Sequence, residues 1–482
     1  MRIIASLLLL AMLTTSCAVG PDYRRPPITS PDQFRGQPAP EGATPSGAPP
    51  SEEASFADLA WWEIVQDESL KALISEALRN GYDVRLAAWR VEEARANAGI
   101  ARSDFFPSIQ GQAGWSRVRD SEFVSPVTET RGLYEVHLGL SWEIDFWGRI
   151  RRLNEAALAQ YLATEEARRG VMLSLVSDVA TSYFNLRKLD SELEIAERTA
   201  AAFLETNDLF TRRYDAGMAS ALETASAAAP LATTQAVIPD LRRQINAQEN
   251  QISLLLGRNP GDVPRGVALD DHLLPPEVPA GLPSDLLKRR PDLQEAEQEL
   301  IAANAEVGVA VADFFPSIRL TALFGGVAPQ VTELFGSGKS WQVGGGLLTP
   351  LFQGERLKNQ HQAALARWEQ AKVNYERSVT NAFAEVSTAL VAYQRLAEVE
   401  IKQAHAVSAY RQAVDLANSR YLSGLSDYLE VLQAQRQLFP AENSLEEIRF
   451  NRLAVLVELY RALGGGWKLD DTQWAKQNLE KS

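Results

Sequence analysis

The sequence Asp-Phe-Phe-Pro-Ser-Ile occurs twice in the chain, at Asp104–Ile109 and at Asp313–Ile318. An alanine-rich stretch with helical spacing precedes each copy, and alternating apolar and polar residues follow it. Proline cannot continue a helix, and it biases the residue before it toward extended backbone. Each hexapeptide therefore predicts a junction between a helix and a strand, and the chain is expected to be built twice around this junction.

A strand pattern follows the hexapeptides. The clearest alternation lies at residues 134–145. Its apolar face carries Tyr134, Val136, Leu138, Leu140, Trp142 and Ile144, and its polar face carries Glu135, His137, Gly139, Ser141, Glu143 and Asp145. About ten residues with two such faces fit a strand between lipid and a water-filled lumen, although a sandwich strand shows the same alternation. We expect strands near residues 107–118, 132–146, 316–326 and 340–351.

Long helices are expected after each pair of strands. Residues 149–214 contain no proline and only Gly170 as an interior breaker, and their apolar residues keep the three- and four-residue spacing of a coiled-coil seam. Roughly 65 residues would make a helix about 100 Å long. Ser220-x-x-Glu223 supplies a capping box for a return helix that Pro230 and Pro239 are expected to interrupt. We expect helical hairpins at about residues 149–257 and 355–463.

The two halves of the chain keep the same register. The hexapeptides begin 209 positions apart, and Tyr214 and Tyr421, at the expected hairpin turns, lie 207 positions apart. Such a period predicts an internal duplication. We assign repeat 1 to residues 61–258, a proline-rich connector to residues 259–283, repeat 2 to residues 284–466 and a C-terminal tail to residues 467–482.

The first residues have the pattern of an export signal. Arg2 gives a positive start, and residues 3–13 form an apolar run too short to cross a bilayer as a helix. Cys17, the only cysteine, follows small residues directly after this run, as in bacterial lipoprotein signals. We expect a signal peptide at residues 1–16 and a lipid such as palmitate on Cys17, with an ordinary signal peptide and an incidental cysteine as the alternative. Residues 17–60, rich in proline, are expected to be an extended tether.

Four strands of this kind require an assembly. Sheet edges open to lipid are not tolerated, and the smallest closed barrels of outer membranes use about eight strands. The chain is therefore expected to form an oligomer in which each protomer contributes four strands. The long hairpins would then form the wall of a shared helical tunnel, and such an assembly is a conduit.

Other functional classes find little support in the sequence. The net charge of −14 argues against a nucleic-acid partner, which would require a basic face. The four histidines show no metal-ligand spacing, and no nucleophile elbow or catalytic carboxylate pair appears. We therefore expect no enzyme activity, no metal and no cofactor apart from the lipid on Cys17.

Three motifs carry a resemblance to a known family. They are Cys-Ala-Val-Gly-Pro-Asp-Tyr-Arg-Arg-Pro at Cys17–Pro26, the paired Phe-Phe-Pro-Ser, and the paired Arg-Tyr-x-x-Gly at the hairpin turns. With them the mature chain resembles the outer-membrane factors of tripartite efflux pumps, the TolC-like family, and above all the lipoprotein branch typified by OprM and the NodT-type proteins. The resemblance implies a homotrimer with a mainly helical fold, in which a twelve-stranded membrane β-barrel continues into a coiled-coil periplasmic tunnel. A mixed equatorial belt would lie near the termini and the connector.

The resemblance also implies a function. Such proteins are passive, lipid-anchored exit ducts of the outer membrane that export drugs, toxic compounds or ions and so contribute to antibiotic resistance. A periplasmic adaptor protein and an inner-membrane, proton-driven transporter of the resistance-nodulation-division type are the implied partners. The exit duct of a type I protein secretion system is one alternative, because the same architecture serves it. A purely structural periplasmic coiled-coil lipoprotein is another, and the lipid-facing strand at residues 134–144 argues against it.

The hairpin turns are the expected gate. In similar proteins, polar links between the turns hold the tunnel closed until the adaptor docks. The matching positions here are Asp215 in the first repeat and Tyr421, Leu429, Glu430, Gln433 and Arg436 in the second. Many relatives carry aspartate where this chain has Gln433, so Glu430 is the candidate for a threefold acidic ring that selects cations or binds divalent ions. The alternative for Glu430 is plain helix capping, as for Glu223.

Two further sets of residues complete the expected site. At the turns, Gly217 and Gly424 end the long helices, and Arg213 and Arg420 are expected either to form salt bridges or to remain solvated. Aromatic residues mark the ends of the strands: Phe105, Phe106, Phe146, Trp147, Phe314, Phe315 and Phe352. They are expected to form an aromatic girdle at the periplasmic membrane interface or, alternatively, a packed collar between barrel and helices.

Overall fold

The structure of the 482-residue chain is a computed structural model. It describes residues 18–31, 33–36, 55–64, 66–119, 121, 123, 130–272, 278–281 and 283–466. The expected signal peptide, Cys17, much of the tether and the tail at residues 467–482 lie outside the described residues. The chain divides into two compact units, of which unit 1 comprises residues 1–28, 90–165 and 295–377, and unit 2 comprises residues 29–89, 166–294 and 378–482.

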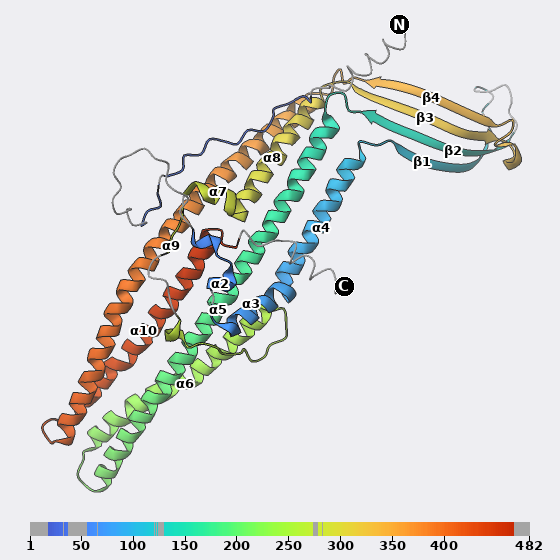
Figure 1. The fold of residues 1–482 in the computed structure, drawn as a ribbon. Coiled ribbons are helices and arrows are strands. Elements are labelled where there is room, and N and C mark those ends of the chain that lie inside the picture. Colours follow the sequence, from blue (N-terminus) through green and yellow to red (C-terminus); the bar gives the residue numbers. More distant parts are fainter. Residues whose placement is uncertain are drawn as a thin grey trace, which may run out of the picture. The chain divides into compact units, whose positions relative to one another are not determined.

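Unit 1 contains one antiparallel sheet of four strands in the order β1-β2-β3-β4 (Figure 1). The strands are β1 (Ser108–Val118), β2 (Arg131–Ile144), β3 (Ser317–Ala328) and β4 (Lys339–Leu348). Each strand begins and ends within three residues of the bounds expected from the sequence. The two strands of each repeat are neighbours, and β2 joins the repeats by pairing with β3 along Tyr134–Ile144.

The two hexapeptides form the same junction. Helix α4 (Tyr82–Ser103) leads into β1, and helix α8 (Pro291–Ala312) leads into β3. In both junctions the second phenylalanine forms a backbone hydrogen bond with the last residue of the helix. The N–H of Phe106 donates to the Ser103 carbonyl, and the N–H of Phe315 donates to the Ala312 carbonyl, each at 3.0 Å. Ile109 lies opposite Leu140 of β2, whereas Ile318 lies opposite Ile144. The prolines therefore lie at one end of the sheet with a stagger along β2, which is the shear that barrel closure requires.

The long helices repeat with equal lengths. The first hairpin consists of α5 (Arg149–Asp215) and α6 (Ala221–Leu255), and the second consists of α9 (Arg356–Leu422) and α10 (Tyr428–Ala462). Both outgoing helices have 67 residues and both return helices have 35. Figure 1 shows both hairpin turns at one end of unit 2. Corresponding helices of the two hairpins are therefore equal in length.

The prolines of the return helices do not interrupt them, contrary to the expectation for Pro230 and Pro239. Helix α6 continues through Pro230 and Pro239, and α10 continues through Pro440. A helical proline removes one backbone hydrogen bond and disfavours the preceding turn. Pro239 and Pro440 are exposed, so water can satisfy the carbonyl that loses its N–H partner. Packing of the rest of each long helix outweighs this local cost.

Short helices and the connector complete unit 2. They are η1 (Phe56–Asp58), α2 (Trp61–Ile64), α3 (Glu68–Asn80), η2 (Leu269–Asp271), η3 (Pro283–Asp285) and α7 (Leu286–Arg289); a further short helix, η4 (Val331–Glu333), lies in unit 1. Asp67, which is 1% exposed, caps α3 by accepting from the N–H groups of Ser69 and Leu70. Its other oxygen accepts from the Tyr183 hydroxyl at 2.7 Å and from the Val267 N–H at 3.0 Å. One buried carboxylate thus joins α3, α5 and the connector.

The residues after Cys17 are seated on unit 1. The Val19 N–H donates to the Trp147 carbonyl at 3.0 Å, and the Pro21 carbonyl accepts from Asn304 at 2.9 Å. Glu297, buried on α8, accepts from both Tyr23 and Arg25. Burial and the neighbouring Glu297 carboxylate raise the pKa of the Tyr23 hydroxyl well above its usual value. This part of the expected tether is therefore held by specific contacts.

Within the described part of the chain, no helix is both long enough and apolar enough to cross a membrane.

The Asp67 junction gives a first prediction. Tyr183→Phe leaves the Gly266 N–H, which donates to the Tyr183 hydroxyl at 2.8 Å, without its acceptor and removes a donor from Asp67. We expect the free energy of unfolding to fall by about 1–3 kcal/mol, measured by guanidinium titration of the detergent-solubilised protein. The matched control is Tyr161→Phe on the same helix, where water can replace the lost bond to Glu165. Equal stability of both variants would contradict the role of Asp67.

The hairpin turns as a candidate gate

The Arg-Tyr-x-x-Gly motif is a helix C-cap. Gly217 and Gly424 have φ values of +72° and +71°, a left-handed conformation that glycine adopts without strain. The residue after each glycine donates its N–H to the carbonyl of the motif arginine, at 2.7 Å for Met218 and 2.9 Å for Leu425. This pattern satisfies carbonyls that the end of a helix leaves free. The same turn therefore ends both long helices.

The two return helices begin differently. In the first hairpin, Ser220 and Glu223 form the expected capping box, and the backbone N–H of Ser220 lowers the pKa of Glu223. In the second hairpin, the side chain of Asp427 makes no capping hydrogen bond, and Glu430 lies 3.3 Å from Arg420. The structure thus differs from the capping expectation for Glu430, because a guanidinium at the end of α9 competes for its carboxylate. Glu430 is about half exposed.

Two tyrosines connect the hairpins near their turns. Arg213 donates a hydrogen bond to the Tyr421 hydroxyl, and its guanidinium lies 5.6 Å from the centre of the Tyr421 ring. Arg213 therefore contacts an aromatic ring where a salt bridge was one expectation. The hydroxyls of Thr206 and Tyr428 are hydrogen bonded, and burial raises the pKa of Tyr428. These contacts join α5 to α9 and to α10.

An apolar cluster lies between the hairpins beside these tyrosines. Its buried members are Phe203, Phe210, Ala227, Leu231, Ala417, Tyr428, Val431 and Leu432, with Ala219, Tyr421 and Ala434 packed against them. The rings of Tyr421 and Tyr428 meet edge to face at 5.0 Å. This cluster was not identified from the sequence, although its members on α10 keep helical spacing. It holds the two turns together by apolar contact as well as by hydrogen bonds.

The remaining gate candidates are exposed. Leu429 is 55% exposed, and Asp215, Gln433 and Arg436 are also exposed. Within the described part of the chain, the side chains of Asp215, Gln433 and Arg436 make no hydrogen bond or ion pair. The structure therefore groups Arg213, Tyr421, Arg420 and Glu430 into contacts and leaves the other three polar side chains available.

The aromatic residues at the strand ends fall into two groups. Trp147 stacks on Phe315 at 4.6 Å, meets Phe146 at 4.8 Å and donates its indole N–H to the Pro316 carbonyl at 2.9 Å. Phe106, Phe314 and Phe352 are 65%, 44% and 88% exposed. Phe105 is partly buried, and its carbonyl accepts from Trp142. Phe146, Trp147 and Phe315 thus pack on one another, with Phe315 still 36% exposed, whereas Phe106, Phe314 and Phe352 make no such contact with Trp147.

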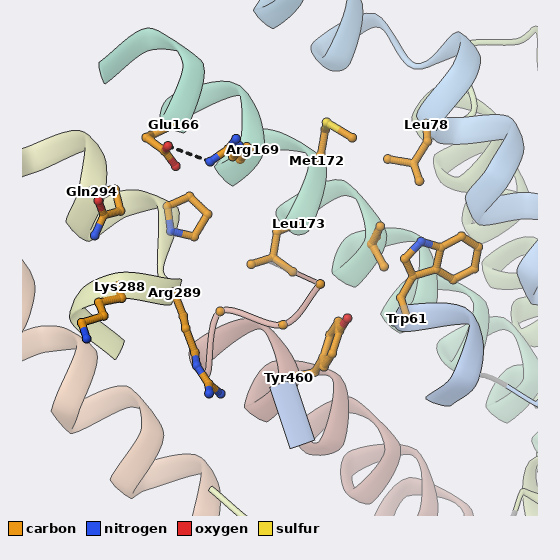
Figure 2. A pocket seen from close by; sticks show the side chains of 15 residues that line it. Trp61, Leu78, Glu166, Arg169, Met172, Leu173, Lys288, Arg289, Gln294 and Tyr460 are labelled. Carbon is orange, nitrogen blue, oxygen red and sulfur yellow. Dashed lines mark hydrogen bonds and ion pairs between the residues drawn. The ribbon is translucent and has the colours of Figure 1, made fainter. Parts of the chain in front are cut away.

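Unit 2 also contains a cavity of about 250 Å³, shown in Figure 2. Apolar side chains, among them Trp61, Leu173 and Tyr460, line one part of it, and Lys288 and Arg289 line another. Among the described residues, no group of three or more histidine, cysteine, aspartate or glutamate side chains could hold a metal ion. The carboxylate in the lining, Glu166, is paired with Arg169 at 2.8 Å (Figure 2).

Comparison with known proteins agrees with this architecture. A family model described as outer membrane efflux protein matches residues 73–258 and 282–465, one segment for each repeat. The solvent efflux pump outer membrane protein SrpC of Pseudomonas putida is 36% identical over 462 residues, which cover 95% of this chain and 97% of that protein. The cation efflux system protein CusC of Escherichia coli O6:H1 is 34% identical over 460 residues, which cover 95% and 97%.

Solved structures show the same fold. A crystal structure of CusC superposes with a TM-score of 0.81 at 33% identity, covering 93% of this chain and all of that one. The open state of the MtrE outer membrane channel of Neisseria gonorrhoeae gives a TM-score of 0.82 at 31% identity, covering 94% and 99%. These relatives are efflux proteins and membrane channels, not enzymes. By its duplicated fold and by both segments of the family match, the chain belongs to the outer membrane efflux protein family.

Proposed function

We propose that the protein is the outer-membrane exit duct of an efflux system, through which compounds pass passively from the periplasmic side to the outside. The observation that carries this proposal is the four-stranded sheet. Its strand β2 alternates apolar and polar residues, and within the described residues β1 and β4 are paired along one edge only. Three copies joined through these edges make a closed barrel of twelve strands with no free edge. The protein is therefore a homotrimer in this proposal.

The hairpin turns are the gate in this proposal. The contacts Arg213–Tyr421 and Thr206–Tyr428 hold the two turns of one protomer together, and Arg420–Glu430 joins the two arms of the second hairpin. Asp215, Gln433 and Arg436 remain available for contacts with a neighbouring protomer or an adaptor. A periplasmic adaptor that binds the turns would compete for these polar groups and so open the tunnel. An inner-membrane transporter of the resistance-nodulation-division type would then deliver the cargo.

The lipid anchor belongs to the same proposal. Acylation of Cys17 would attach the chain to the outer membrane directly before the seated residues that begin at Ala18. Ala18 packs against Gly148, where a side chain on the glycine would come within 2.7 Å of it. The anchor would therefore emerge beside the junction between β2 and α5.

Cargo is proposed only by class. Relatives bear the names of solvent, toluene, cation and antibiotic efflux proteins. We propose drugs, toxic organic compounds or ions as cargo for this chain. Deletion of the gene is expected to sensitise cells to such compounds without loss of any secreted protein. Loss of a secreted protein with unchanged sensitivity would instead indicate type I secretion.

Assembly gives a direct test. The protein is expected in outer-membrane fractions as a trimer whose electrophoretic mobility changes on heating, and the purified trimer is expected to conduct ions in planar bilayers. A monomeric or soluble protein that forms no channel would refute the exit-duct function. Labelling with a radioactive fatty acid, lost in Cys17→Ser, tests the anchor in the same preparation.

The acidic residue at the second turn gives another test. Glu430→Gln removes the carboxylate that a threefold ring would present and frees Arg420. We expect lower cation selectivity and weaker block by divalent ions, measured as reversal potential and single-channel current. Glu223→Gln is the control because it occupies the equivalent place in the first hairpin, where its carboxylate caps α6. If the Glu430 and Glu223 variants both behave as wild type, no acidic ring exists.

A further inference from the structure

One buried carboxylate joins the two hairpins away from the turns. Glu442 of α10 is 5% exposed, and its oxygens accept from arginines on two other helices. Arg411 of α9 donates to Oε1 at 2.7 and 3.0 Å, and Arg198 of α5 donates to Oε2 at 3.1 Å. A buried carboxylate is stable only when it is paired and hydrogen bonded. Glu442 therefore fixes α10 against both outgoing helices; we call this contact the Glu442 clasp.

A weak point of α10 lies directly beside the clasp. Pro440 has no backbone N–H, so the Arg436 carbonyl has no helical partner one turn later. Helices bend most readily at such positions. On the turn side of Pro440, α10 carries all four gate candidates of the return helix, Leu429, Glu430, Gln433 and Arg436. On the other side, Ala441 and Leu445 pack against Val407 of α9.

There is also room for movement on the turn side. A cavity of about 430 Å³ adjoins the clasp. Its lining includes Arg198, Arg411, Gln435, Leu438, Phe439 and Glu442. The side-chain oxygen of Gln435 is buried without a hydrogen-bond partner among the described residues. The cavity therefore leaves space beside Gln435, Leu438 and Phe439, whereas Tyr428, Val431 and Leu432 of the same segment are packed in the apolar cluster near the turns.

We propose that Glu442 is a positioning residue for the gate: the clasp holds α10 at Pro440, and when it is released the segment Tyr428–Phe439 pivots there toward the adjoining cavity, a movement that also separates Tyr428, Val431 and Leu432 from the apolar cluster near the turns. This inference rests on the proposed gating at the hairpin turns. Pro440 then divides α10 into a moving segment, which carries the gate candidates, and a fixed segment, which carries Glu442. Arg198 and Arg411 are 55% and 59% exposed as side chains, so water can receive them after release.

The test is single-channel recording of the trimer with Glu442→Gln, which keeps the volume of the side chain and removes its charge. We expect the fraction of time in the large-conductance state to rise about tenfold or more, because the variant leaves α10 without its charged link to both hairpins. Glu446→Gln is the matched control. Glu446 is similarly buried one turn further along α10; it also hydrogen bonds with Ser191 of α5, but its arginine, Arg449, lies on the same helix at 2.7 Å, so its ion pair does not join the hairpins.

Two further variants separate the clasp from general loosening. Pro440→Ala restores the missing N–H and is expected to suppress most of the opening when combined with Glu442→Gln. Glu442→Asp, which keeps the charge, is expected to open less than Glu442→Gln. If Glu442→Gln does not form the heat-modifiable trimer, the recording is made with Arg411→Gln instead. This variant removes the ion pair between α9 and α10 and keeps the ion pair of Arg198 with Glu442.

The outcomes are distinct. Wild-type gating in a properly assembled Glu442→Gln trimer, or equal opening in the Glu446 control, overturns the clasp. Opening that Pro440→Ala does not reduce overturns the pivot at Pro440. If even the wild-type trimer forms no channel, the exit-duct function fails and the clasp fails with it.

Discussion

A β-strand satisfies its backbone only when both of its edges are hydrogen bonded, and the sheet of this protein leaves one edge of β1 and one edge of β4 to be satisfied within the described residues. In a hydrocarbon environment water cannot fill that role, so another chain must. The duplication brings four strands into one sheet, and the long hairpins repeat with the same lengths. The pairing of β2 with β3 joins the strands of the two repeats into one sheet.

Most of the fold follows from residue spacing. A period of two residues marks the strands, three- and four-residue spacing marks the helices, and the hexapeptides mark each change between them. Pro230 and Pro239 of α6 were misleading because the cost of a helical proline is local, whereas the packing of a 35-residue helix extends over its whole length. The division of the chain into two units was not visible in the sequence, because α5 and α9 contribute to both.

The candidate gate was only partly predictable. Equivalent positions in the two repeats suggested equivalent roles for Glu223 and Glu430, yet only Glu223 caps its helix. The difference depends on the ion pair between Arg420 and Glu430. This ion pair is a tertiary contact, and residue spacing in the sequence does not predict it. The aromatic set shows the same limit: sequence position places all seven side chains at strand ends, but only the folded chain separates the stacked Trp147 and Phe315 from the exposed Phe352.

The seated N-terminal segment has a consequence for the timing of folding. Tyr23 and Arg25 reach Glu297, and Pro21 reaches Asn304, so each contact closes a loop of more than 270 residues. Contacts so distant in sequence form late, because a long loop must close before they can contribute. During folding, residues 21–25 must therefore wait for the second repeat before they can make these contacts. The contacts of residues 21–25 with α8 therefore form only when both repeats are present.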